Sequence, residues 1–126
     1  MADSVHIINM EKILIYDIGP DYEEWRYLMV APADTEIKAN WNEARNKIKE
    51  LNIEGFTDWR LPDREQLNIL FQNFHRHGLG DFQNERYWSS KKDVSNYVWD
   101  QDFANGSQGA NFNSSEYFVR AIRVYE

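Results

Sequence analysis

Two aspartates, Asp100 and Asp102, stand two residues apart in a segment rich in aromatic residues. Alternate residues of a strand point to the same face, so these two carboxylates would lie side by side. Glycoside hydrolases use such pairs, with the carboxyl groups about 5 Å or about 6.5–9.5 Å apart. Any strand with two exposed acids passes this test. We therefore interpret the pair first as part of a solvated face and second as a hydrolase site.

The sequence gives less support to a catalytic serine or to a metal site formed by histidines. Neither Ser89-Ser90 nor Ser114-Ser115 has the glycine-flanked turn that exposes a catalytic serine. His75 and His77 would need a further metal ligand, and none stands at a convincing spacing. Their place beside Gly78 instead predicts a capping or surface role at a helix end. No phosphate-binding glycine loop is found, so we expect a protein that is not an enzyme and has no metal and no cofactor.

The polar stretch after residue 96 is the best candidate for a functional surface. It is rich in Tyr, Asn, Ser, Asp and Gly, which suit adaptable recognition because Tyr gives contact area at low entropic cost and the others hydrogen-bond flexibly. The same residue types also make turns, and composition alone does not separate the two interpretations. Alternation predicts that Val98, Asp100 and Asp102 face away from Tyr97, Trp99, Gln101 and Phe103. The predicted ligand-binding residues are Tyr97, Asp100, Asp102, Asn105, Ser107, Asn111, Asn113 and Ser115.

Three arginines stand near aromatic residues, namely Arg60, Arg120 and Arg123. In a small domain such arginines most often pair with a carboxylate or stack on a ring. We favour this structural role over ligand binding and expect Arg60 to pair with a neighbouring acid such as Asp58.

These residues must be positioned by a fold that mixes helices and strands. Trp41, Ala44, Ile48 and Leu51 fall at helical spacing, with Asn40 and Glu43 as a capping box, and predict a helix over 40–52. Gly55 supplies the left-handed residue after it.

A second helix is predicted after Pro62. Asp63 and Gln66 form its capping box, and its apolar stripe is Leu67, Leu70, Phe71 and Phe74. Strands are predicted over 5–8, 12–16, 25–31, 87–90, 97–103 and 117–124, with a loop over 104–116.

The composition sets wide limits on function. A chain of 126 residues fits a single domain over 1–126, and 15% aromatic residues provide heavy core contacts. The absence of cysteine excludes disulfides and cysteine-based zinc sites. The net charge of −7 argues against nucleic acid and anionic membranes as partners. With no membrane-length apolar run and no signal peptide, we expect a protein that is cytoplasmic or released within a larger assembly.

Several segments in order resemble a known family. They are Gly55–Pro62 with its Asp-Trp-Arg-Leu-Pro motif, Glu65–Leu67, Tyr87–Ser90, Val98–Phe103 with Asn105-Gly106, and Tyr117–Arg123. Together they are similar, over about 41–125, to the domain-of-unknown-function family at the C-terminus of bacterial collagen-like adhesins. The resemblance implies an α+β, C-type-lectin-like fold, with two helices and antiparallel sheets, related to the sulfatase-modifying-factor group. It also implies an early strand paired with the last one, and a non-catalytic domain that presents a ligand-binding surface.

The sequence lacks motifs on which the activities of related families depend, which narrows the functions that the resemblance implies. Formylglycine-generating relatives act through cysteines, which this chain lacks. Calcium-dependent lectins use a Glu-Pro-Asn or Gln-Pro-Asp motif together with Trp-Asn-Asp. This sequence has neither motif, and Trp99-Asp100 matches the second only in part. Calcium binding is therefore not predicted. The C-terminal third also resembles the variable region of retroelement-diversified binding proteins, which favours recognition as the role of the polar stretch.

We therefore predict a non-catalytic recognition module that binds a protein or a glycan through its polar C-terminal loop and strand surface. Two alternatives remain. One is a structural subunit of a phage or secreted assembly, whose exposed aromatic residues form a homo-oligomer interface. The other is a hydrolase that uses Asp100 and Asp102. We expect the segment Gly55–Pro62 to be part of the lectin-like scaffold, with Trp59 filling the core.

Overall fold

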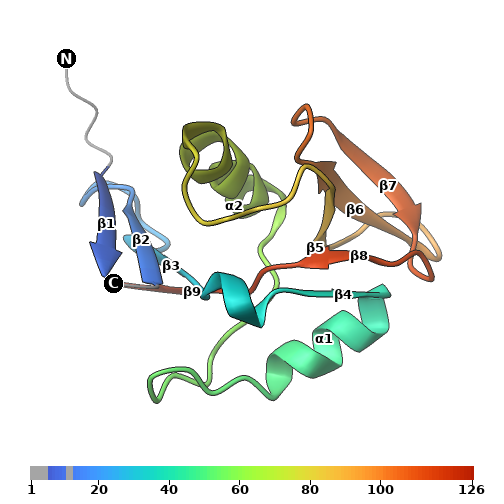
Figure 1. The fold of residues 1–126 in the computed structure, drawn as a ribbon, viewed down its shortest axis with the longest axis horizontal. Coiled ribbons are helices and arrows are strands. Elements are labelled where there is room, and N and C mark those ends of the chain that lie inside the picture. The colour runs from blue at the N-terminus through green and yellow to red at the C-terminus, as the bar shows by residue number, and fades with distance from the viewer. Residues whose placement is uncertain (1–5, 11–12) are drawn as a thin grey trace.

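The computed structural model describes residues 6–10 and 13–126, which form two sheets and two α-helices (Figure 1). The α+β class and the two helices are as predicted. One sheet has the strand order β1-β2-β3-β9 and the other β4-β8-β5-β6-β7. The elements are β1 (His6–Met10), β2 (Ile13–Asp17), β3 (Tyr27–Val30), β4 (Ile37–Ala39), α1 (Trp41–Lys49), α2 (Arg64–Ile69), β5 (Arg86–Lys92), β6 (Tyr97–Asp102), β7 (Gln108–Phe112), β8 (Tyr117–Val119) and β9 (Ile122–Tyr125).

The pairing of the strands is antiparallel except between β5 and β8, which run parallel. An early strand pairs with the last one, as expected, because β3 pairs with β9 from Tyr27↔Tyr125 to Val30↔Ile122. Residues 5 and 12, where two predicted strands begin, lie outside the described residues.

Both helices begin at the predicted capping boxes. The Asn40 side chain accepts a hydrogen bond from the Glu43 N–H at 2.9 Å, and Glu43 accepts one from the Asn40 N–H at 3.3 Å. Helix α1 ends at Lys49, earlier than predicted, because the chain turns back through an Ile53–Phe56 bridge with Gly55 at a φ of 85°. No helix among the described residues is long and apolar enough to cross a membrane.

Helix α2 continues past Ile69 in a widened form. Asp63 and Gln66 make the expected reciprocal cap at 2.8 and 2.9 Å. A π-helical turn over Leu70–Phe74 and a 3-10 turn over His75–His77 follow, and Gly78 ends the segment at a φ of 73°. The predicted apolar stripe is buried, since Leu67, Leu70, Phe71 and Phe74 all lie in the core.

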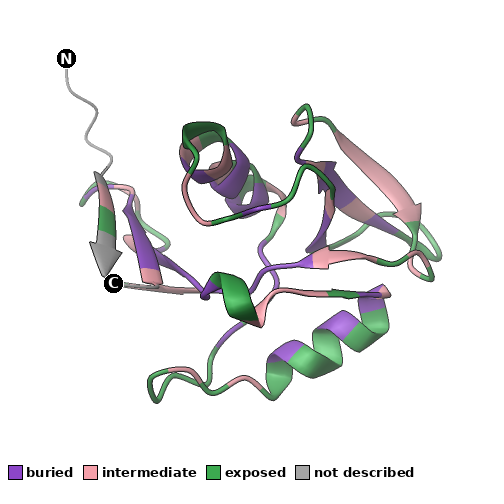
Figure 2. Cartoon of the chain, viewed as in Figure 1, coloured by how far each residue is buried: buried purple, intermediate pink, exposed green. Residues whose placement is uncertain are grey.

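The two helices cover different parts of the core. Residues of α2 and of its continuation pack with β2, β3 and Phe103, whereas α1 packs with Trp59, Trp88 and Val119. Figure 2 shows the buried residues on the inner sides of both helices and along β5 and β6, with exposed residues on the outer side of α1.

The segment Gly55–Pro62 is hydrogen-bonded to one strand of each sheet. Trp59 is buried and donates its indole N–H to the Phe56 carbonyl at 2.9 Å. The Arg60 backbone pairs with Ile122 through bonds of 2.8 and 2.9 Å, and the Pro62 carbonyl accepts the Ser90 N–H at 2.8 Å. Trp59 therefore fills the core, as predicted.

The pairing predicted for Arg60 is wrong. The acid of this segment, Asp58, is instead bonded by Arg123 at 2.6 Å, and no ion pair of Arg60 is found in the described part of the chain. The backbone bridge from Arg60 to Ile122 explains why Asp58 pairs with Arg123, because it brings the residue after Ile122 beside Asp58. The hydrogen bond from Arg123 holds the pKa of the Asp58 carboxyl below its usual value.

Three strand predictions are also corrected. Strand β4 was not anticipated, and β7 lies inside the predicted loop 104–116. The single strand predicted over 117–124 is two strands, because Val119 pairs with Ile37 in one sheet and Ile122 pairs with Val30 in the other. The chain passes from sheet to sheet at Arg120-Ala121.

Replacing Trp59 with Ala should lower the free energy of unfolding by about 3–5 kcal/mol, because the change removes a buried indole and leaves a cavity. Urea unfolding of the two proteins measures the difference. Val94→Ala, at a strongly exposed position, is the control and should change stability by less than about 0.5 kcal/mol. A Trp59→Ala protein of unchanged stability would contradict the role of Trp59 in the core.

Candidate functional site

The predicted site residues lie on and around the hairpin of β6 and β7. These strands pair without interruption from Tyr97↔Phe112 to Gln101↔Gln108. The hairpin stands at the outer end of the five-stranded sheet, and the turn between its strands and the loops at its other end are largely exposed (Figures 1 and 2). Side chains of opposed residues share a face of the sheet, so Asp100 and Asn111 lie on one face and Tyr97 and Phe112 on the other. This agrees with the predicted alternation.

The turn between β6 and β7 is built by its own polar side chains. The Asp102 carboxylate accepts the Ala104 N–H at 2.9 Å, and the Asn105 side chain accepts both the N–H and the hydroxyl of Ser107 at 2.9 Å. Gly106 has a φ of 88°, and a Cβ there would lie 2.5 Å from the Phe71 ring. Asn105 and Ser107 are exposed, but part of their hydrogen-bonding capacity serves the turn.

Asp100 does not belong to an exposed surface, and its prediction as a ligand-binding residue is wrong. It is 1% exposed. One carboxylate oxygen accepts from the Arg86 guanidinium at 2.6 Å and the other from the Asn111 amide at 2.6 Å. Burial raises the pKa of this carboxyl, while the bonds from Asn111 and Arg86 oppose the rise. The sequence pattern could not show this burial, because the two partners come from neighbouring strands.

The second face of the hairpin carries an exposed aromatic pair, Tyr97 and Phe112. The two rings stack with centroids 4.6 Å apart and planes 29° from parallel. Tyr97 is 37% exposed and Phe112 51%. The Tyr97 N–H donates to the carbonyl of Val94, another strongly exposed apolar residue. This end of the hairpin therefore presents apolar surface to solvent.

Farther along the same face, polar groups from α2 cover the strands. The Arg64 guanidinium lies 3.6 Å from the centre of the Trp99 ring and donates to Gln108 at 2.9 Å. Gln108 donates to Gln101, which in turn donates to Asn68. This amide network fixes the side of the hairpin nearer α2 and leaves the aromatic pair as the open part of the face.

Asn113 and Ser115 lie in the loop that follows β7, at the aromatic end of the hairpin. The Asn113 N–H donates to the Asn96 carbonyl at 2.8 Å, and the Ser115 N–H to the Phe112 carbonyl at 3.0 Å. Both residues are partly exposed. The structure thus brings Asn113 and Ser115 to the same end as Tyr97, whereas Asn105 and Ser107 lie at the opposite end of β7.

Sequence reasoning missed the residues that complete this surface. Phe112 and Val94 are more exposed than Tyr97, and Arg64 stacks on Trp99 from a distant helix. The alternation of Gln108, Ala110 and Phe112 was a usable signal for a strand. Gly109 and Asn111, between them, favoured a loop instead.

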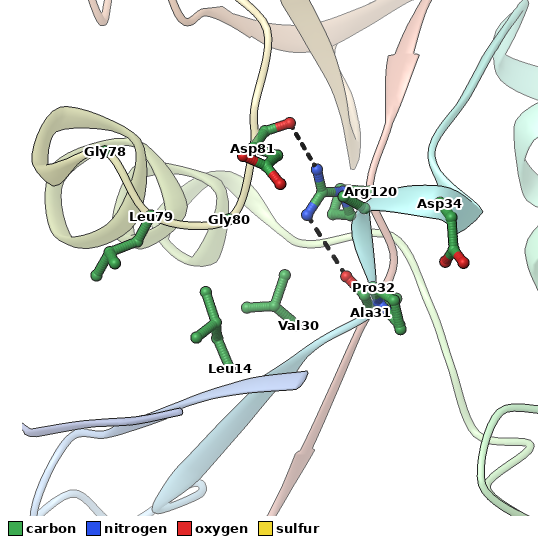
Figure 3. A pocket seen from close by; sticks show the side chains of 11 residues that line it. Leu14, Val30, Ala31, Pro32, Asp34, Gly78, Leu79, Gly80, Asp81 and Arg120 are labelled. Carbon is green, nitrogen blue, oxygen red and sulfur yellow. Dashed lines mark hydrogen bonds between the residues drawn. The ribbon is translucent and has the colours of Figure 1, made fainter. Parts of the chain in front are cut away.

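A concave region lies beside Arg120, between the end of β3 and the turn after the second helix (Figure 3). Its volume is about 390 Å³. The Arg120 guanidinium at its edge donates to the carbonyls of Asp81 at 3.2 Å and Ala31 at 3.5 Å and is paired with Glu36. The structural role predicted for Arg120 is confirmed, and its charge is already matched by a carboxylate.

The two histidines at the end of the second helix have different surroundings. The His75 ring packs against Phe103 at 5.4 Å and makes a hydrogen bond with Asn84 at 2.7 Å, whereas His77 is exposed. No group of three or more His, Cys, Asp or Glu able to hold a metal ion is found among the described residues.

Comparison with known proteins identifies the family of this chain. Residues 21–123 match the family of the Lcl C-terminal domain, which is most of the chain, so the protein belongs to that family. The predicted resemblance is confirmed, and the match agrees with the C-type-lectin-like α+β fold. No curated protein matches the sequence.

Replacing Asn111 with Ala should lower the free energy of unfolding by about 1–3 kcal/mol, because one oxygen of the buried Asp100 carboxylate loses its donor. Asn113→Ala is the matched control. Among the described residues only backbone bonds are found for Asn113, so its change should stay within about 0.5 kcal/mol. Equal stability of the two variants, measured by thermal or urea unfolding, would show that Asn111 is not needed to hold Asp100.

Proposed function

We propose that this member of the Lcl C-terminal domain family is a non-catalytic recognition module that contacts its ligand through the aromatic end of the β6–β7 hairpin. The observation that carries the proposal is a concentration of exposed apolar side chains. Of the five large hydrophobic residues that are exposed in the described part of the chain, three lie at this end, namely Val94, Tyr97 and Phe112; the others are Ile8 and Phe56.

The surroundings of the aromatic pair suit recognition. Exposed apolar groups bordered by polar ones are typical of interaction sites. Asn113 and Ser115 provide hydrogen-bonding side chains at the border, and the backbone of their loop is held by bonds to Asn96 and Phe112. Stacked rings lose little conformational freedom when a ligand covers them, so little of the contact energy is spent on ordering them.

The state of the acids supports a role without catalysis. Both oxygens of Asp100 already accept hydrogen bonds, and Asp102 accepts one from the turn that follows it. A hydrolase would need a carboxyl that faces substrate in a cleft. Asp100 is buried, and Asp102 lines a concave region beside Arg86 and Glu116 but accepts the turn's N–H. The net charge of −7 further favours a protein or glycan ligand over nucleic acid.

Binding of the purified domain to arrays of glycans and of surface proteins tests the proposal. The Tyr97→Ala and Phe112→Ala variants should each bind a captured ligand at least about tenfold more weakly, because each removes a central aromatic contact. Their melting temperatures should remain near that of the wild type, since both side chains are exposed.

The control for this experiment is Glu23→Ala, an exposed position on the segment before β3, which should leave binding unchanged. Binding that survives both aromatic substitutions would place the ligand elsewhere and contradict the proposal. Self-association of the wild type that disappears in Phe112→Ala would instead identify the aromatic end as an oligomer interface.

A further inference from the structure

Strand β7 is the terminal strand of the five-stranded sheet, with β6 on one side only (Figure 1). Its pairing with β6 fixes the direction of each backbone group. The Asp102 N–H donates to the Ser107 carbonyl, and the Asn113 N–H donates to the Asn96 carbonyl. Because backbone groups alternate along a strand, Gly109 and Asn111 are bonded to β6. The N–H groups of Gln108, Ala110 and Phe112 therefore point to the free edge.

This free edge carries a ladder of backbone groups that is open to solvent. Within the described residues no backbone partner is found for the N–H groups of Gln108, Ala110 and Phe112 or for the carbonyls of Gln108 and Ala110. Donors and acceptors thus repeat every second residue, at about 6.8 Å. Only another extended backbone presents the complementary groups at this spacing.

Edges of sheets in soluble proteins are usually protected by charge, proline, bulges, short length or a covering segment. Strand β4, the other edge of this sheet, has three residues and includes Lys38. Strand β9, at the edge of the first sheet, is covered by the Arg60 bridge. By contrast, β7 has the sequence Gln-Gly-Ala-Asn-Phe, without charge or proline, and pairs with β6 without a bulge. It has none of these sequence protections.

The side chains beside the edge define what an added strand would contact. Gln108, Ala110 and Phe112 share the face that carries Trp99 and Tyr97. Alternate side chains of an incoming strand would fall on this face, beside the half-exposed Phe112 ring. An apolar residue opposite Phe112 would cover the ring.

We propose that β7 binds an extended segment of a partner protein by strand addition, with apolar side chains at alternate positions packing beside Phe112. This proposal rests on the function proposed above and names the ligand class as polypeptide. In strand addition the backbone bonds provide affinity and the alternate side chains provide specificity.

A second copy of this chain fits the edge less well than a partner segment. Two copies paired antiparallel about Ala110 would place each Phe112 opposite the polar Gln108 of the other. Each copy also carries a net charge of −7, and this repulsion opposes their association. A partner segment is free of both constraints.

A phage-displayed library of random dodecapeptides, selected on the wild-type protein, provides the probe. The most enriched peptide is synthesised and its affinity measured by calorimetry. Ala110→Pro should weaken binding at least about tenfold, equivalent to about 1.4 kcal/mol, because it removes one outward donor and adds a ring at the edge. Ala110→Val, which keeps the N–H, is the matched control and should bind within about threefold of the wild type.

Two further measurements keep the test independent of the folding of Ala110→Pro. Two methylated peptides are compared, one methylated at the odd-numbered and one at the even-numbered backbone nitrogens. One should bind more weakly and the other should bind as well as the parent peptide, because only alternate N–H groups face β7. In amide NMR spectra of the wild type, bound peptide should shift Gln108, Ala110 and Phe112 more than Gly109 and Asn111.

Three results would overturn the proposal. They are failure to enrich any peptide, equal affinity of the peptide for Ala110→Pro and the wild type, and a wild-type dimer in sedimentation that Ala110→Pro dissociates. If an array ligand is lost in Tyr97→Ala but retained in a folded Ala110→Pro protein, strand addition fails while the recognition function stands.

Discussion

The buried guanidinium of Arg120 connects segments of this fold that are far apart in sequence. Its side chain is 1% exposed and pairs with Glu36, 84 residues away, at 2.8 Å. Tyr87 donates its hydroxyl to the same carboxylate at 2.7 Å, and the Phe82 ring lies 4.1 Å below the cation. Burial raises the pKa of the Tyr87 phenol, which keeps it a donor. Removing Glu36 or Arg120 would leave the other charge buried without a partner, which typically costs about 3–5 kcal/mol of stability. The network therefore holds β5 and the segment before β4 around Arg120.

The position of Arg120 explains why the network matters for the whole architecture. The chain leaves β8 and enters β9 at this residue, so it changes from one sheet to the other there. The next residue, Ala121, accepts a backbone bond from Ala31, and Ile122 bonds to Arg60. The buried core surrounds this crossing on both sides, with α2 toward one cluster and α1 toward the other. The β6–β7 hairpin lies at the outer end of the five-stranded sheet, and Tyr97 and Phe112 at its aromatic end are exposed.

Local signals in the sequence predicted local structure well. Asn40 and Asp63 cap their helices as expected, and the stripe from Leu67 to Phe74 is buried, because caps and helical periodicity depend on residues three or four apart. Features that depend on distant pairing were not predictable. Asp100 looked exposed until Arg86 and Asn111 were placed on its neighbouring strands. Asp58 pairs with Arg123 rather than with Arg60, two residues away, and the Gly and Asn residues of β7 favoured a loop over a strand. Of the exposed aromatic pair on this hairpin, Tyr97 was among the residues predicted from the sequence, whereas Phe112 was not.

The proposed recognition by strand addition requires that the outer edge of β7 is open. Residue-resolved amide hydrogen exchange measures this directly on the unmodified protein, because exchange reports whether each N–H is bonded and how readily it opens. The account predicts slow exchange at Gly109 and Asn111, which bond to β6, and at Ile122, which bonds to Arg60 at the centre of the fold. It predicts fast exchange at Gln108, Ala110 and Phe112. Protection of these three amides equal to that of Gly109 and Asn111 would show that the edge is already covered and would contradict the account.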